Sequence, residues 1–180
     1  MAARPTRYNS AMLRAYRGRH PVVHPTAYVD ESAQVVGDVE IGAESSIWLN
    51  VVARGDVNYI RIGARTNVQD GTVVHVQHDT HPAVLGDEVT VGHAAIVHGC
   101  VIGNRVLIGM GAIVLTGARI GEDVIVAAGA LVTEGMVVSP RSLVMGLPGR
   151  VTRRLTDVDV AFIREHADNY VRYRQDYQIK

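Results

Sequence analysis

The sequence predicts an all-β solenoid, a chain that winds in triangular coils of short parallel strands. Three observations lead to this fold class: most large apolar residues are β-branched, aliphatic residues recur every six positions, and glycine often follows them. The chain has 30 Val and 12 Ile against 9 Leu, with one Phe and one Trp. Because β-branched side chains favour strands, the composition excludes an all-helical protein and disfavours a sandwich or barrel packed around aromatic residues.

The six-residue repeat carries the fold prediction. A period of six fits neither a helix nor a hairpin, but it fits a chain that turns a corner at every step and closes a coil every three steps. Four residues after each aliphatic stands a small or β-branched residue, such as Ala33 or Ala112, which lets the corner close. The aliphatic positions are Val29, Val35, Ile41, Ile47, Ile62, Val68, Val74, Leu85, Val91, Val97, Ile102, Ile108, Val114, Ile120, Val126, Val132, Val138 and Val144.

The repeat divides one structural domain into three segments. We expect an N-terminal segment over 1–22, the β-helix over 23–150 and a C-terminal helix over 151–180, packed along one face of the coil. The turn Gly146-Leu147-Pro148-Gly149 ends the repeat, and Thr156 or Asp157 is the expected helix N-cap. Aromatic residues of this helix are expected to form its docking stripe. Its helical spacing is read from Val160, Ile163, Ala167, Tyr170, Val171 and Tyr177.

Charge and cysteine content narrow the classes of partner. The chain has 18 basic and 18 acidic residues, so no one-signed field favours nucleic acid or an anionic membrane. Its single cysteine, Cys100, excludes an internal disulfide, suits a reducing compartment and is expected to be a small buried residue. No secretory signal is found in Met1–His20, and no run has the length of a membrane span, so we expect a cytoplasmic protein.

The register of the coils places three of the histidines relative to one another. Two insertions interrupt the repeat, one of three residues before Ile62 and one of five before Leu85. Counting through them aligns Arg54, His75 and His98 at the same position of consecutive coils. The two imidazoles then lie one rung apart, close enough to bind one metal ion at about 2.0–2.1 Å.

A third histidine occupies a different column. Asp70 and His93 share the next position along, which lies on the preceding face, so His93 points around a corner from the pair. It can join the pair only across a three-fold interface, and the register thus predicts a homotrimer with three intersubunit sites. Three neutral imidazoles leave a tetrahedral divalent ion one open position, and such an ion lowers the pKa of bound water to about 7.

The motifs around these residues resemble those of the γ-class carbonic anhydrases and their bacterial relatives. The resemblance covers the chain from about His24 to the terminal helix. It implies a left-handed parallel β-helix of the hexapeptide-repeat superfamily, assembled as a homotrimer. The motifs are Asn50-Val51-Val52-Ala53-Arg54-Gly55-Asp56, Thr66-Asn67-Val68-Gln69-Asp70-Gly71, Val73-Val74-His75 and Val91-Gly92-His93-Ala94-Ala95-Ile96-Val97-His98-Gly99-Cys100.

The resemblance also assigns the ligands of the ion. His75 and His98 of one subunit and His93 of the next would hold zinc, and iron or cobalt can occupy such sites in the family. Gln69 would orient the metal-bound water or bicarbonate by hydrogen bonding, with Asn67 in support.

The charged residues have two interpretations. The resemblance implies that Arg54 pairs with Asp70 across the interface and that Asp56 joins this network. The three side chains then act either in catalysis directly or as an ion-pair set of the interface, because buried charges must be paired in both cases.

The sequence departs from the archaeal γ-class enzyme at two places. Val57 stands where that enzyme has Glu, and a short loop with His78 and His81 replaces its acidic loop. Either histidine could shuttle protons, since an unperturbed pKa near 6.5 suits that role, or both are surface residues of the loop. Tyr170 or Tyr173 of the terminal helix is a further candidate for the proton shuttle.

These residues predict an enzyme, a carbonic anhydrase-like lyase that reversibly hydrates CO₂ to bicarbonate by metal-bound hydroxide. The first alternative is a metal-dependent thioesterase or other hydrolase at the same ion, because activation of water does not select CO₂. The others are a hexapeptide acyltransferase and a non-catalytic trimeric binding or assembly protein. The fold by itself does not choose among them.

Overall fold

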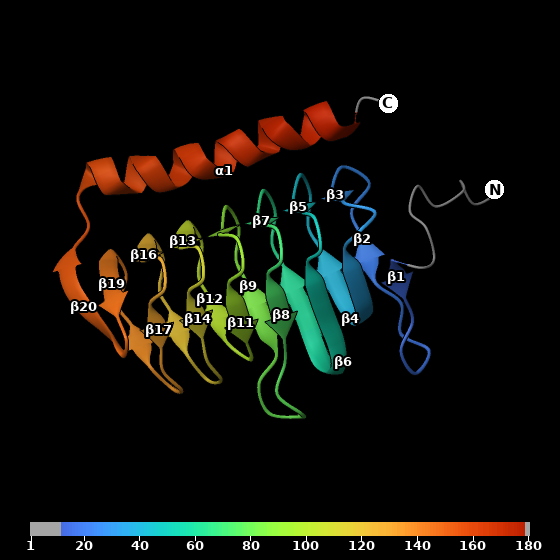
Figure 1. Cartoon of the computed structure of the whole chain (residues 1–180), viewed down its shortest axis with the longest axis horizontal. Helices are drawn as coiled ribbons and strands as arrows, with labels where there is room; N and C mark the ends of the chain where they lie inside the picture. Colours follow the sequence, from blue (N-terminus) through green and yellow to red (C-terminus); the bar gives the residue numbers. More distant parts are fainter. Residues whose placement is uncertain (1–11, 179–180) are drawn as a thin grey trace.

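The chain forms a three-sided parallel solenoid with one long helix along its side (Figure 1). This structure is a computed structural model, and it describes residues 12–178. The fold class predicted from the repeat, a left-handed parallel β-helix with a C-terminal helix, is confirmed. We call its three sides faces A, B and C in the order in which the chain visits them after each coil begins.

Short strands stack on every face. Face A holds β1 (Leu13–Arg14), β8 (Val73–His75), β11 (Ile96–His98), β14 (Ile113–Val114) and β17 (Leu131–Val132). Face B holds β2 (Val22–Val23), β9 (Ala83–Leu85), β12 (Val101–Ile102), β15 (Arg119–Ile120) and β18 (Val137–Val138). Face C holds β3 (Tyr28–Val29), β5 (Ser46–Ile47), β7 (Asn67–Val68), β10 (Thr90–Val91), β13 (Val106–Ile108), β16 (Val124–Val126) and β19 (Ser142–Gly146).

Two longer strands, β4 (Gln34–Ile41) and β6 (Val52–Ile62), run from face A around the corner onto face B. The three-residue insertion of the repeat lies in β6, where the register with β4 also shifts. The long strands therefore join faces A and B into a single 12-stranded sheet, while face C belongs to a separate 8-stranded sheet.

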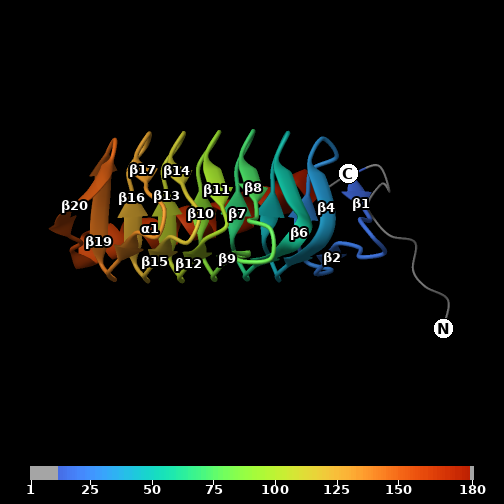
Figure 2. The ribbon, with the colours of Figure 1, turned by 90° about the horizontal axis from the view of Figure 1, so that it is seen from below.

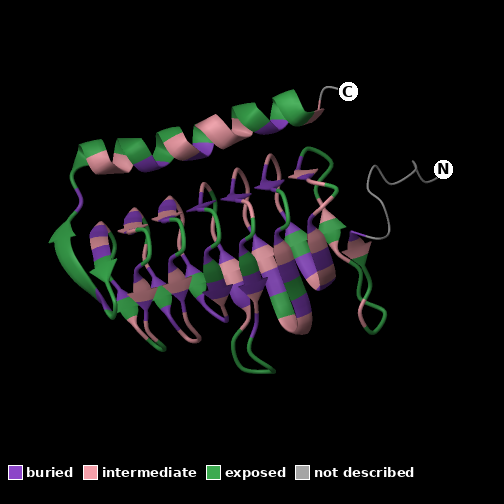
Figure 3. Ribbon diagram, in the orientation of Figure 1, coloured by how far each residue is buried: buried purple, intermediate pink, exposed green. Residues whose placement is uncertain are grey.

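The interior is a set of aliphatic columns one side chain wide. On face A, Val35, Ala53, Val74 and Val97 pair rung by rung and are all 0% exposed. The alternation of buried and exposed positions along the strands is visible in Figure 3. A narrow prism has no room for rings, which explains why the single Trp and the single Phe lie outside it, on face C and on the helix.

One corner repeats a left-handed backbone at residues other than glycine. Six corner residues between faces B and C have φ between 54° and 57°, a conformation that L-residues adopt at a cost. Their side chains alternate in charge and pair along the stack: Arg65 contacts Glu44 at 3.1 Å and Glu88 at 3.5 Å, and Arg105 contacts Asp123 at 2.7 Å. The six residues are Glu44, Arg65, Glu88, Arg105, Asp123 and Arg141.

The two ends of the solenoid are built from segments that the repeat did not predict. At the start, β1 and β2 pair with β4 and extend faces A and B by one rung. At the other end, β20 (Gly149–Arg154) returns antiparallel to β19. The segment 151–180, expected as a helix, therefore begins with residues of a strand, because the turn at Leu147-Pro148 lets the β-branched Val151 and Thr152 close the last coil.

The helix α1 (Asp157–Gln178) lies along face C and runs back toward the first coils (Figures 1 and 2). Thr156 is its N-cap: its hydroxyl accepts the N–H of Asp159, and the Asp159 carboxylate accepts the N–H of Thr156 at 2.7 Å. None of the helices in the described part of the chain is long and apolar enough to cross a membrane.

Aromatic rings pack the C-terminal half of α1 against the coil. The ring of Trp48 lies 5.4 Å from Tyr170 and 5.0 Å from Tyr177. Close by, the buried guanidinium of Arg174 donates to the carbonyl of Thr26 at 2.6 Å and to Glu44 at 3.2 Å. The expected docking stripe is thus confirmed for Tyr170 and Tyr177, which contact Trp48, although Tyr177, like Phe162 and Tyr173, stays about half exposed.

Candidate metal centre

Two imidazoles meet at the end of face A. Strand register places His98 directly above His75, and both lie above Arg54, as the sequence predicts. The Nδ1 of His75 lies 3.2 Å from the Nε2 of His98. Two ligands of a tetrahedral ion with bonds of about 2.0–2.1 Å have nitrogens about 3.4 Å apart, so this spacing suits a shared metal ion.

The second nitrogen of each ring is held by an oxygen from a neighbouring rung. The Nε2 of His75 lies 3.1 Å from the Asp56 carboxylate, and the Nδ1 of His98 lies 2.9 Å from the Thr116 hydroxyl. Such partners fix the tautomer and orientation of metal-binding histidines. Burial, the neighbouring His75 ring and the Arg54 guanidinium lower the pKa of His98, which favours the neutral ring that binds metals.

The Asp56 carboxylate contacts both His75 and Arg54 at this corner. Burial opposes its ionisation, but hydrogen bonds from His75, Arg54 and the Val57 N–H lower its pKa overall. Arg54 forms its ion pair with Asp56 within the same chain. The predicted network of Arg54 and Asp56 is therefore present, while the predicted partner of Arg54 across an interface, Asp70, lies elsewhere on the chain.

The third histidine lies at the corner between faces C and A. His93 and Asp70 stand on adjacent rungs, and the Nδ1 of His93 is 2.9 Å from the Asp70 carboxylate. The His93 side chain is 46% exposed, against 18% for His75. Within residues 12–178 of one chain, no three His, Cys, Asp or Glu side chains gather closely enough to hold a metal ion. His93 thus points away from the pair, as the register predicts.

The donor set of the three histidines fits a divalent metal ion. Each ring has one nitrogen held by an oxygen of an adjacent rung: Asp56 for His75, Thr116 for His98 and Asp70 for His93. By contrast, the loop histidines His78 and His81 bond the side chain next to them in sequence. Oxygen partners from separate rungs orient the three rings rigidly, which is what ligands of a bound ion need.

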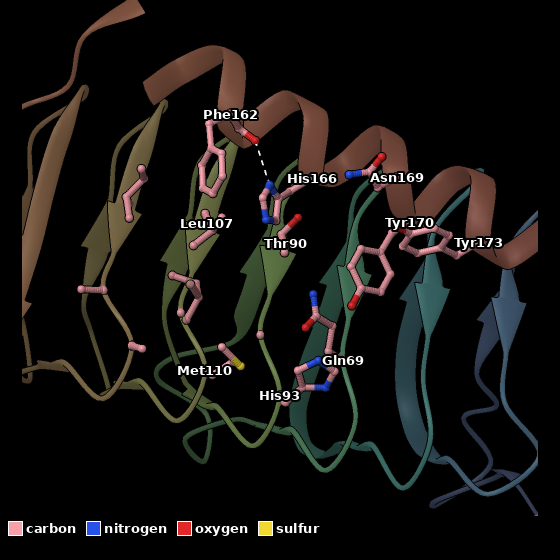
Figure 4. A pocket seen from close by; sticks show the side chains of 16 residues that line it. Gln69, Thr90, His93, Leu107, Met110, Phe162, His166, Asn169, Tyr170 and Tyr173 are labelled. Carbon is pink, nitrogen blue, oxygen red and sulfur yellow. Dashed lines mark hydrogen bonds between the residues drawn. The ribbon is translucent and has the colours of Figure 1, made fainter. Parts of the chain in front are cut away.

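A polar chain leads to the His93 corner. The Thr90 hydroxyl accepts the Asn67 amide at 2.9 Å, and the Asn67 oxygen accepts the Gln69 amide at 3.1 Å. Both amides are nearly fully buried. Because the Gln69 nitrogen is directed to Asn67, its oxygen is turned toward the space beside His93 (Figure 4). Burial and the nearby Asp70 carboxylate raise the pKa of Tyr170 to about 12, so its hydroxyl keeps its proton at neutral pH.

The loop between β8 and β9 carries the other two histidines. It projects from the end of face A (Figure 1), and His78 is 68% exposed beside Asp79. His81 bonds the Thr80 hydroxyl at 3.0 Å. Neither contacts His75 or His98 through a hydrogen bond described for residues 12–178, so a role as proton shuttle stays a prediction. Burial raises the pKa of Cys100 to about 12, and its thiol is an inert core group.

A groove of about 530 Å³ opens between face C and α1. Gln69 and His93 line one end of it, and Phe162 and Tyr173 of the helix line its upper side (Figure 4). The sequence did not predict this groove, because it exists only where the helix crosses the strands.

Thr116 is the site residue that sequence reasoning missed. Register pairs Val97 with Val114, so strict counting places Leu115 above His98. The corner after β14 has one more residue than the corner after β11, and this brings the Thr116 hydroxyl over the His98 ring. No repeat pattern signals that contact.

Known proteins share this architecture. Residues 99–134 match the model of the bacterial transferase hexapeptide family (six repeats). Protein YrdA of Escherichia coli is 45% identical over 93% of this chain and 95% of its own. A carbonic anhydrase of Geobacillus kaustophilus is 42% identical over 93% and 91%. A hexapeptide transferase family protein from Anaplasma phagocytophilum has a crystal structure with a TM-score of 0.90 and 38% identity, covering 94% of this chain and 99% of that one.

The solenoid and its repeat define a hexapeptide-repeat protein, with oriented histidines at two of its corners. Similarity over more than nine-tenths of the chain narrows this class further. The chain belongs to the γ-class carbonic anhydrase-like family, and the predicted enzyme class, a carbonic anhydrase-like lyase, is confirmed at the level of that family.

Proposed function

We propose that this protein reversibly hydrates CO₂ at metal centres shared between the subunits of a homotrimer. The observation that carries the proposal is the divided histidine set: His75 and His98 at one corner and His93 at another, each with its second nitrogen fixed from an adjacent rung. A carbonic anhydrase that is 42% identical to this chain supports CO₂ as the substrate.

The exposed surface of face A supports the trimer. Val73 and Ile96 stand two residues before His75 and His98, and they point to the same side of the sheet. They are 37% and 40% exposed, beside Leu49 at 36%. Exposed aliphatic residues grouped between two incomplete metal-binding corners are what a subunit interface would cover. In such a trimer the exposed His93 would lie against the pair of the next subunit.

Zinc, or iron or cobalt in its place, would supply a water of lowered pKa at neutral pH. The chain's own residues do the rest. Asp56, Thr116 and Asp70 hold the three rings in place, and Asp56 is kept ionised by Arg54. The Gln69 oxygen, fixed through Asn67 and Thr90, accepts a hydrogen bond from an O–H group beside His93. The Tyr170 hydroxyl, on the helix side of the groove, would donate a hydrogen bond to the bound substrate.

Hydration of CO₂ to bicarbonate releases a proton that must reach solvent. His78, His81 and Tyr170 are the candidates on this chain. The exposed loop histidines suit exchange of protons with solvent because their side chains reach water. A hydroxyl with a pKa of about 12 suits hydrogen-bond donation better than proton carriage.

The test combines metal analysis, light scattering and stopped-flow CO₂ hydration. We expect a trimer with about one metal ion per chain, active on CO₂, and a His93→Ala variant that keeps the fold but loses metal and activity. A trimer free of metal after growth in zinc, iron or cobalt would overturn the proposal. So would a wild-type trimer that is loaded but inert to CO₂.

Acyl transfer or thioester hydrolysis at the same centre is the second candidate. The groove under α1 favours it, because a volume of about 530 Å³ exceeds what CO₂ requires. The solved hexapeptide transferase family protein has the same fold. A loaded trimer that cleaves an acyl-CoA thioester but does not hydrate CO₂ would favour this candidate.

A further inference from the structure

The groove under α1 has two chemically different ends. At one end Gln69, His93 and Tyr170 gather, with the Tyr170 hydroxyl directed toward the Gln69 amide (Figure 4). At the other end Leu107 and Ile125 of the strands and Phe162 of the helix form a mostly apolar wall, with His166 packed beside Phe162 (Figure 4). Such a division suits a ligand with a small polar head and an apolar tail.

The apolar end is exposed in the single chain. Phe162 of this end is 47% exposed, and Met110, which lines the groove beside His93, is 59% exposed (Figure 4). Apolar side chains grouped along a groove gain stability when an apolar ligand covers them. The volume of about 530 Å³ falls within the range of pockets that hold small organic ligands of many atoms.

The polar end limits what the head group can be. His93 is one of the three proposed metal ligands, so a head group at this end lies beside the proposed centre. Bicarbonate, the product of the proposed reaction, presents two carboxylate oxygens and one hydroxyl. An alkyl carboxylate presents the same two oxygens, with a hydrocarbon chain in place of the hydroxyl.

We propose that the groove binds alkyl monocarboxylates, with the carboxylate at the His93 and Gln69 end and the chain between Leu107 and Phe162. This inference rests on the metal centre proposed above. The ion would balance the charge of the carboxylate, which Asp70 would otherwise repel, and the Tyr170 hydroxyl would donate a hydrogen bond to it. A carboxylate in this position excludes bicarbonate, so binding also inhibits CO₂ hydration competitively with bicarbonate.

Calorimetric titration of the zinc-loaded trimer with butanoate, hexanoate and octanoate tests the proposal. Each added methylene buried in the groove is expected to raise the affinity by about fourfold. An affinity that does not change with chain length would overturn the proposal, and so would equal binding of octanoate by the zinc-free trimer.

Two groove variants and one matched control locate the binding site. Leu107 and Ala128 both line the groove on the side of the strands. Leu107→Trp and Ala128→Leu fill it from that side and should weaken octanoate binding at least tenfold. Val101→Trp adds the same ring to an outward strand position on face B and should bind octanoate like the wild type. Light scattering and thermal unfolding check that each variant folds. Unchanged octanoate binding by both folded groove variants would overturn the proposal.

Failure of this inference differs from failure of the proposed function. A trimer that hydrates CO₂ but binds no octanoate refutes the groove and leaves the enzyme. A loaded trimer that binds octanoate with the expected chain-length dependence, yet does not hydrate CO₂, refutes the proposed reaction and leaves the groove.

Discussion

The two corners that carry the histidines are made by the same repeat, but each lacks what the other has. The corner after face A holds two imidazoles on adjacent rungs, with nitrogens 3.2 Å apart and His75 mostly covered. The corner after face C holds one imidazole, His93, which is nearly half exposed and backed by Asp70. One corner has two facing imidazoles and the other has one.

This difference teaches how a repeat protein can divide a site. In a solenoid, residues at the same position of successive coils stack in a column about 4.8 Å apart. Two histidines on one column therefore come together without any loop. A third ligand for a tetrahedral ion cannot lie on the same straight column. In the proposed trimer, it would come from the His93 corner of another subunit.

Mixing of two defective chains tests the division most severely. His75→Ala and His93→Ala trimers should each lose metal, because each site keeps two ligands at most. Refolded together in equal amounts, they should regain about a quarter of the wild-type metal content, since a complete site needs an intact pair from one chain and an intact His93 from the other. Elemental analysis of the mixed trimers measures this.

Refolded wild-type protein gives the reference value for that mixture. His24→Ala, which removes a histidine distant from both corners, should retain all of its metal when refolded alone. If the mixture stays metal-free while both chains form trimers, the three histidines do not form a shared site.

A charge on face A should separate the subunits of the proposed trimer, and with them the two kinds of corner. Ile96→Glu places a carboxylate among the exposed aliphatic residues of face A, where burial in an interface would leave it unpaired. The trimer should dissociate to monomers and lose its metal, as measured by light scattering and metal analysis. Val101→Glu is a close control, because Val101 is 37% exposed on face B against 40% for Ile96. If both variants stay trimeric, the interface lies elsewhere.

The oxygen atoms that hold the imidazole rings should contribute less to zinc binding than the imidazoles themselves. Asp70→Asn removes the charge behind His93, and Thr116→Val removes the hydroxyl behind His98. Each should weaken zinc binding by about 10–100-fold in a competition with a chelator, because groups that hydrogen-bond to metal-binding histidines typically contribute that much. Asp79→Asn removes a similar carboxylate, 3.0 Å from the loop residue His78, and should leave the zinc affinity unchanged. Equal losses from all three would show that the effect is not specific to the corners.

The helix over face C stands near only one of the two corners. Thr156→Ala removes its N-cap and should lower the free energy of unfolding by about 1 kcal/mol. Urea unfolding followed by circular dichroism measures this. Thr152→Ala alters a hydroxyl outside the helix and is the comparison. A loss of zinc affinity without a loss of stability would contradict a purely structural role for the cap.

Acidification should remove a stabilising interaction at the N-terminus of α1. Hydrogen bonds from Arg153 and Thr156 lower the pKa of Asp159 below its ordinary value. A group with a lowered folded pKa stabilises the fold above its unfolded pKa of about 3.9 and loses that contribution as the pH falls through the folded value. The stability difference between wild type and Asp159→Asn should therefore be constant near neutral pH and vanish in strong acid. A difference that grows below pH 4 would contradict this sign.

Much of the site could be predicted because register in a solenoid is arithmetic. Once the two insertions are counted, the alignment of Arg54, His75 and His98 follows from the period, and the structure confirms it. The position of His93 on another face follows in the same way. The resemblance of the motifs placed Asp56 in a network with Arg54 but named Asp70 as the partner of Arg54. That Arg54 turns toward Asp56 of its own chain is shown by the structure, since spacing alone does not show which way a long side chain turns.

The sequence by itself determined the coil, its interior and the columns, because a six-residue period is a local property that every coil repeats. Tertiary structure decided the rest. Thr116 reaches His98 because two corners differ by one residue, and β20 closes the last coil by turning back on β19. The groove depends on where α1 crosses face C, and that crossing is set by contacts between residues distant in sequence, such as Trp48 with Tyr170 and Arg174 with Thr26. A periodic pattern carries no information about such contacts, since they form only when the helix packs back onto the finished solenoid.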